Sequence, residues 1–134
     1  MTFKSYKNWL NEQNTIKIGN YDLPISIIKK EDWPEGKNDP TEFSSDEDIV
    51  RVREDYDYKK DPVGWIRHEA MHHKLHHNKG FKDDGKEYPT NNTEEKAYIF
   101  QFKYLKNKGY KKLGEVPGMK KSYPEILQKY WNEA

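Results

Sequence analysis

The chain has 134 residues, of which 33% are hydrophobic and 35% are charged, with a formal net charge of +1. This length fits one domain over 1–134, and an aromatic content of 14% is too high for a disordered chain. Without cysteine, disulfides and thiolate metal sites are excluded, so any metal must be held by His, Asp or Glu. No nucleic-acid-binding module, signal peptide or membrane span is recognisable, and we expect a cytoplasmic protein that binds neither nucleic acid nor membrane.

The first half of the chain predicts one helix and three strands. A helix is expected over 4–12, where apolar residues recur at helical spacing. Strands are expected over 15–18 and 23–28, joined as a hairpin by a Gly-Asn turn. The segment 33–48 is dense in Pro, Gly, Ser and Asp and is predicted to be a loop. The segment 48–54 alternates apolar and charged residues, as a half-exposed strand does.

The second half of the chain predicts three helices. Asp61 followed by proline is a typical helix start, so the first is expected over about 62–78. The second is expected over about 93–108, before a glycine. A capping box of Ser122 and Glu125 predicts the last, ending near residue 132. The elements together indicate an α+β domain with a short, mostly antiparallel sheet of about three strands and three to four helices.

Residues 68–72 on the first of these helices spell H-E-x-x-H. Positions four apart lie about 40° apart around a helix and one turn along it, so His68 and His72 can reach one ion. Glu69 flanks them, close enough to contact a water on the metal but poorly placed to be a ligand. In a metal-assisted hydrolase, two neutral imidazoles hold zinc, zinc lowers the pKa of its water towards about 7, and the carboxylate takes the proton.

The two candidate ligands lie on the apolar stripe of their helix, which should face the core. The members of that stripe, within about 60° of His68, are Trp65, His68, Met71, His72 and Leu75. Burying two unpaired histidines would cost a few kcal/mol, and a shared metal avoids that cost. His73 and His77 fall on the opposite side, where we expect them to meet water, and His76 lies at the edge of the stripe.

A third ligand must be a carboxylate, because all five histidines lie on this one helix. The next helix offers Glu94 and Glu95. Glu94 falls on the apolar stripe of that helix, whereas Glu95 lies at the margin of the stripe, about 100° from Glu94 around the helix axis. A first-turn glutamate is also ordinary at a helix N-terminus, so position alone does not decide. We expect His68, His72 and Glu94 to hold Zn²⁺, with Glu95 as the alternative to Glu94.

The H-E-x-x-H helix followed by a helix carrying "EEKAY" (94–98) resembles the gluzincin branch of the zincin metallopeptidases, especially its minimal single-domain members and the ImmA/IrrE type. The resemblance covers about 48–108. It implies a zincin-like domain with His68, His72 and Glu94 as zinc ligands and Glu69 as general base.

The same resemblance implies roles for two further parts of the chain. The strand over 48–54 would be the edge strand along which an extended peptide pairs, although an ordinary sheet edge would look the same. Tyr98 stands where many relatives carry Asp or Asn. Its hydroxyl could orient a ligand histidine, or donate a hydrogen bond to the transition-state oxyanion. Tyr88, Tyr104 and Tyr110 are open candidates for a separate electrophile.

The sequence therefore predicts a zinc metallopeptidase that acts on a peptide or protein substrate. The alternative is a non-catalytic protein of zincin fold that uses zinc structurally and acts in an interaction or within a virion. A small core and the lack of an identified electrophile favour that alternative. A helical protein without metal is the third reading. Substrate specificity and oligomeric state cannot be predicted from the sequence.

Overall fold

The computed structural model describes residues 13–134, so the helix predicted over 4–12 lies outside the described residues. Within that range the chain forms four β-strands, three α-helices and two 3-10 turns. The strands are β1 (Gln13–Ile18), β2 (Tyr21–Ile28), β3 (Thr41–Ser44) and β4 (Ile49–Arg53). The helices are α2 (Trp65–His76), α3 (Asn92–Asn107) and α4 (Pro124–Glu133), and the 3-10 turns are Lys30–Asp32 and Leu113–Glu115. The predicted α+β class is confirmed, with four strands rather than about three.

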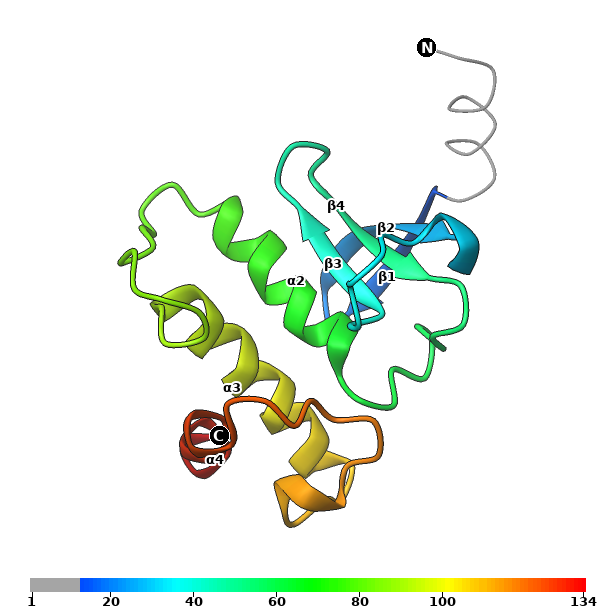
Figure 1. Ribbon diagram of the computed structural model, residues 1–134. Coiled ribbons are helices and arrows are strands. Elements are labelled where there is room, and N and C mark those ends of the chain that lie inside the picture. The colour runs from blue at the N-terminus through cyan, green and yellow to red at the C-terminus, as the bar shows by residue number, and fades with distance from the viewer. Residues whose placement is uncertain (1–12) are drawn as a thin grey trace, which may run out of the picture.

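The four strands form one mixed sheet in the order β1-β2-β4-β3 (Figure 1). The predicted hairpin is confirmed, since β1 and β2 pair antiparallel around a turn in which Gly19 has a φ of 63°. β2 and β4 pair parallel, whereas β3 and β4 pair antiparallel. None of the helices in the described part of the chain is long and apolar enough to span a bilayer.

The loop predicted over 33–48 is wrong in part, because it contains β3. In β3 the residue Phe43 lies opposite Val50 of β4. β4 therefore lies inside the sheet, between β2 and β3, and the prediction that 48–54 is the edge strand is also wrong. Alternation along a strand reports that one of its faces is buried, but it carries no information about which strands pair with it.

Helix α2 lies between the sheet and α3 (Figure 1). On the sheet side a buried apolar cluster joins β2 and β4 to α2; its members are Leu23, Ile25, Val50, Val52, Ile66 and Ala70. On the other side a larger cluster joins α2, α3 and α4; its members are Val63, Trp65, Tyr98, Phe102, Leu105, Val116, Met119, Leu127, Tyr130 and Trp131. Because α2 is covered on two sides, residues on two of its faces are buried.

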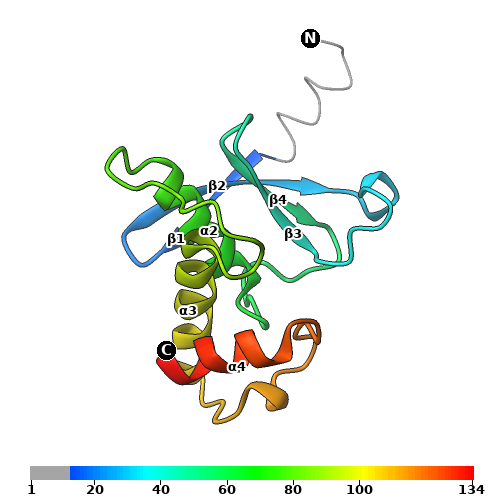
Figure 2. The same ribbon diagram turned by 60° about the vertical axis from the view of Figure 1, so that its left-hand side comes forward.

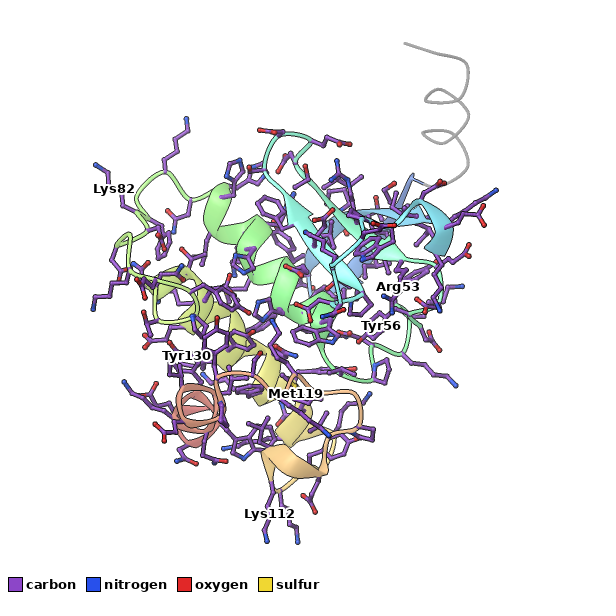
Figure 3. The ribbon with its side chains drawn as sticks, in the orientation of Figure 1. Arg53, Tyr56, Lys82, Lys112, Met119 and Tyr130 are labelled. Atoms are coloured by element: carbon purple, nitrogen blue, oxygen red, sulfur yellow. The ribbon has the colours of Figure 1, made fainter. Side chains whose placement is uncertain are left out.

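Helix α4 lies against the end of α3 that points away from the sheet (Figure 2). Tyr130 on α4 and Met119 in the loop before α4, both labelled in Figure 3, belong to the apolar cluster around α3. The predicted helix is confirmed, but the predicted capping box is not. The N-cap is Tyr123, in the left-handed conformation with a φ of 54°, and it makes no side-chain cap hydrogen bond.

The start of α2 touches α3 closely at Gly64. This glycine is the N-cap residue of α2 and has a φ of 80°. A Cβ built on it would lie 2.9 Å from Cγ of Gln101 on α3. Glycine is required here both for the backbone conformation and for space, and the close approach brings the first turns of α2 against α3.

Asp61 accepts hydrogen bonds from the first turn of α2, although it lies upstream of the N-cap residue Gly64. The helix begins at Trp65 rather than Pro62, yet the fully buried Asp61 carboxylate accepts the N–H groups of Ile66 at 3.0 Å and Arg67 at 3.2 Å. The same carboxylate pairs with the Arg67 side chain at 3.0 Å. The predicted role of Asp61 as acceptor for the free N–H groups is thus confirmed.

Candidate metal centre

His68, His72 and Glu94 lie together where α2 faces the first turn of α3. Oε1 of Glu94 is 3.0 Å from Nε2 of His68, and its Oε2 is 2.7 Å from Nε2 of His72. One ligand atom from each residue can be chosen so that all three lie within 4.8 Å of one another. Ligand atoms of a tetrahedral zinc ion lie ~3.3 Å apart when each bond is ~2.0 Å. Small side-chain shifts would therefore let the three close on one ion.

Glu94, rather than Glu95, is the carboxylate that reaches the histidines. The Asn91 side chain caps α3 by accepting the Glu94 N–H at 2.8 Å, which fixes the first turn. From this turn the Glu94 side chain lies beside both imidazoles. Within residues 13–134, Glu95 belongs to no group of three potential ligands.

Gln101 on α3 determines which nitrogen of His68 is available to a metal. The Gln101 Nε2 donates to the Val63 carbonyl at 2.9 Å, so its Oε1 is the atom that faces Nδ1 of His68, also at 2.9 Å. An amide oxygen only accepts hydrogen bonds, so Nδ1 of His68 carries the proton. In neutral His68 the lone pair is then on Nε2, the atom that points at Glu94.

The carboxylate of Glu94 is ionised and lies between the rings of His68 and His72. Burial raises the pKa of Glu94, but hydrogen bonds and the charges of His68 and His72 outweigh it and hold that pKa far below its usual range. Burial lowers the pKa of His72, but the hydrogen bond to Glu94 and the charges of Glu69 and Glu94 raise it overall. An ionised carboxylate facing two imidazole nitrogens needs either protons or a metal ion between them.

Glu69 is buried next to this group, with 8% of its surface exposed. Its Oε2 accepts a hydrogen bond from Oγ1 of Thr41, on β3, at 2.9 Å. It is therefore held by the edge strand and is not part of the ligand cluster, as its position between the histidines predicts.

These residues line one cavity of about 220 Å³. Its walls come from β3, from α2, from the start of α3 and from the loops before β3 and α3. They are formed by Asp39, Thr41, Glu42, Phe43, Trp65, His68, Glu69, His72, Tyr88, Glu94 and Tyr98. β3, the strand at the end of the sheet, contributes Thr41, Glu42 and Phe43 to the wall of the cavity that holds Glu69 and the histidines.

Tyr98 lies in the cavity wall, but its hydroxyl contacts no histidine that would make it an orienting group. Its ring packs edge-on against His68, with centroids 4.4 Å apart, and its hydroxyl lies 2.5 Å from that of Tyr88. Burial, then the charge and hydrogen bond of Tyr88, raise the pKa of Tyr98 far above its usual range. The histidine-orienting role that the sequence offered for Tyr98 belongs instead to Gln101.

Tyr88 is the more accessible of the two tyrosines, with 41% of its surface exposed. Its hydroxyl accepts a hydrogen bond from Nζ of Lys120 at 2.9 Å, and Lys120 also pairs with Asp39 at 3.1 Å. Burial lowers the pKa of Lys120, but Tyr88 and Asp39 raise it overall, so the lysine stays charged. Tyr104, by contrast, donates its hydroxyl to the backbone carbonyls of Lys60 and Asp61, remote from the cavity.

The prediction that His73 meets water is wrong. His73 is 6% exposed, and its Nδ1 contacts the hydroxyl of Tyr21 on β2. The helical wheel assigns one buried face to α2, but the sheet covers a second face. His77, one turn further on, is exposed as predicted.

Comparison of the chain with models of protein families, with curated proteins and with solved structures found no match. Inference about function therefore depends on the geometry of the site.

Proposed function

We propose that the chain is a zinc-dependent metallopeptidase, with His68, His72 and Glu94 as the zinc ligands. The observation that carries this proposal is the convergence of two Nε2 atoms and one carboxylate at 2.7 and 3.0 Å, beside a further buried carboxylate in the same cavity. Two imidazoles and one carboxylate are a ligand set of catalytic zinc sites, which keep a fourth position open. When bound, zinc supplies Lewis acidity that makes water nucleophilic near neutral pH and polarises a carbonyl group.

Glu69 is the general base of the proposed reaction. Its carboxylate takes a proton from the attacking water and passes it to the nitrogen of the leaving amine as the peptide C–N bond breaks. The hydrogen bond from Thr41 holds one of its oxygens, so the orientation of the base depends on β3. This link makes the edge strand part of the catalytic arrangement.

Tyr88 is the proposed hydrogen-bond donor to the carbonyl oxygen of the substrate, which becomes an oxyanion when water attacks the carbonyl carbon. It is more exposed than Tyr98, it lines the cavity, and its oxygen already accepts a hydrogen bond from Lys120. The Tyr88 proton is then available either to Tyr98 or to a substrate oxygen. Preorganised donors of this kind stabilise the transition state because they need not reorient during the reaction.

The proposed substrate is a peptide or a segment of a protein bound in an extended conformation. β3 is the end strand of the sheet and contributes Thr41, Glu42 and Phe43 to the cavity. An extended peptide can add to such an edge by main-chain hydrogen bonds, which would place one of its carbonyl groups beside Glu69. We therefore propose β3, rather than the segment 48–54, as the edge strand along which the peptide pairs.

The test is the Glu69→Gln variant. We expect it to bind zinc as the wild type does and to lose about 10²–10⁴-fold in the rate of peptide hydrolysis, because the base is lost and the ligands are kept. Hydrolysis of a fluorogenic peptide library is measured alongside zinc content, with Glu95→Gln as the matched control that keeps both. Wild-type activity in Glu69→Gln would exclude the proposed mechanism.

A structural role for zinc, without turnover, is the second candidate function. The position of the ligands favours it, since His68 and His72 come from α2 and Glu94 from α3, and an ion among them would tie the two helices together. A closed site with four protein ligands and no peptide hydrolysis by the zinc-loaded wild type would support this function over the first.

A further inference from the structure

A second pair of histidines lies one turn apart at the C-terminal end of α2, on the side turned toward the sheet: His73 is in the last turn of the helix and His77 is its C-cap residue. Nε2 of His77 is 2.7 and 2.8 Å from the two carboxylate oxygens of Asp48, in the turn between β3 and β4. Nε2 of His73 is 3.2 Å from the nearer of these oxygens. Ligand atoms chosen one from each of the three residues lie within 4.8 Å of one another.

The buried member of this group lacks a hydrogen bond on the side that faces Asp48. Across residues 13–134, Nε2 of His73 is one of two buried side-chain nitrogens without a hydrogen-bond partner. On the other side of the ring, Nδ1 contacts the hydroxyl of Tyr21. A ring nitrogen held by a hydrogen-bonding partner while the opposite nitrogen points at other ligand atoms is the arrangement found around metal-binding histidines.

We infer that Asp48, His73 and His77 form a second divalent-cation site, separate from the site of His68, His72 and Glu94. His72 and His73 are neighbours in sequence but project about 100° apart around the helix. Helix α2 together with its C-cap residue His77 therefore supplies a histidine pair to each site. Two imidazoles and one carboxylate suit zinc, nickel, copper or cobalt and do not suit calcium or magnesium. The side chains of Asp48 and His77 are 43% and 52% exposed, which leaves the site open to an ion from solvent.

A cation here would clamp the β3–β4 turn onto the end of α2. Phe43 on β3 connects this clamp to the cavity, because its ring stacks on His72 at 6.5 Å and meets His73 edge-on at 5.8 Å. The second site would therefore restrain the strand that holds Glu69 through Thr41. The site itself does not depend on the proposed hydrolysis.

The test uses the untagged full chain, stripped of metal and titrated with zinc by calorimetry. We expect two equivalents for the wild type, and one for His77→Ala, which removes an exposed ligand and leaves the core intact. Asp48→Asn should also weaken the second equivalent, and asparagine tolerates the φ of 54° at this position. His76→Ala, which changes an exposed histidine of the same helix outside both groups, is the control and should keep two equivalents.

The site would be overturned by a wild type that binds only one equivalent of zinc, or by a His77→Ala variant that still binds two. A second equivalent that binds only at millimolar zinc would also overturn it. The proposed restraint of the β3–β4 turn is tested by amide hydrogen exchange in β3. Exchange should slow when a second equivalent of zinc is added to the wild type, and it should not slow in His77→Ala. Unchanged exchange in β3 of the wild type would contradict the proposed restraint. Loss of the first equivalent in His72→Ala reports on the other site alone, so failure of one proposal is distinguishable from failure of the other.

Discussion

Nδ1 of His68 lies 2.9 Å from Oε1 of Gln101, across the contact between α2 and α3. This hydrogen bond fixes the imidazole so that its other nitrogen faces Glu94. It also means that the proposed zinc site depends on a residue that is not a ligand. Groups of this kind typically change metal affinity by about 10–100-fold when they are replaced.

Two variants, Gln101→Leu and Gln101→Glu, should separate the effect of Gln101 on the orientation of His68 from its effect on the stability of the fold. Leucine leaves Nδ1 of His68 without an acceptor, so we expect zinc affinity to fall about 10–100-fold. Glutamate keeps the acceptor, and its zinc affinity should stay close to that of the wild type. Both variants remove the donor to the Val63 carbonyl and should lower stability by about 1–3 kcal/mol. Zinc competition titrations and thermal melts measure the two effects, and equal zinc affinity in both variants would contradict the assigned role.

Thr41→Val should impair the proposed catalysis while zinc stays bound. Valine has nearly the shape of threonine but cannot donate the 2.9 Å hydrogen bond to Glu69. Hydrogen bonds to charged groups contribute about 1.5–3 kcal/mol, so we expect a roughly 10–100-fold loss of kcat/KM if the bond orients the base. Thr90→Val, on an exposed threonine outside the cavity, is the control. Full activity in Thr41→Val would show that β3 does not position Glu69.

Tyr88→Phe tests the proposed oxyanion donor. Removing one such donor costs about 10²–10³-fold in kcat, and zinc content should not change. Tyr123→Phe is the matched control, because Tyr123 is exposed and packs edge-on against Tyr88 with ring centroids 5.6 Å apart. A rate loss in Tyr98→Phe but not in Tyr88→Phe would identify Tyr98, rather than Tyr88, as the oxyanion donor.

Zinc affinity should rise with pH across the titration of His72. The pKa of His72 is raised in the folded, metal-free protein, so its contribution to stability is complete below the unfolded value of ~6.5 and is lost as pH rises through the folded pKa. Zinc needs the neutral ring and must displace this proton, so the association constant should increase about tenfold per pH unit below the folded pKa. The lowered pKa of Glu94 keeps it ionised throughout this range. The measurement is made in His77→Ala, so that one site is observed, and an affinity independent of pH between about 5.5 and 7.5 would contradict the assignment.

Local patterns in the sequence predict the hairpin and the three helices within residues 13–134, although α2 begins three residues later than expected. Turn residues and helix-end signals act over a few positions, so the hairpin forms around the expected Gly-Asn turn and α3 begins within one residue of its expected start. β3 is missed because it is only four residues long, in a segment rich in turn-forming residues, and it is held by pairing with β4. That pairing is a property of the folded chain rather than of the segment.

The candidate site is predictable where a helical repeat carries it. His68, His72 and Glu94 lie on the inward stripes of two helices, and Gln101 lies two turns after Glu94 on the same face. No repeat predicts Thr41 or Lys120: Thr41 lines the cavity from a short strand, and Lys120 contacts Tyr88 in the cavity wall from a loop. His73 is misassigned because a wheel finds one buried face, whereas α2 has the sheet on one side and α3 on the other.

The most direct test of the central claim is a crystal structure of the zinc-loaded chain, with anomalous diffraction measured at the zinc absorption edge. We predict an anomalous peak about 2.0–2.2 Å from Nε2 of His68, Nε2 of His72 and a carboxylate oxygen of Glu94, with the fourth position not filled by protein. Absence of a peak among these three residues would contradict the claim that they hold zinc. A fourth protein ligand on the ion would contradict the claim that the site is catalytic.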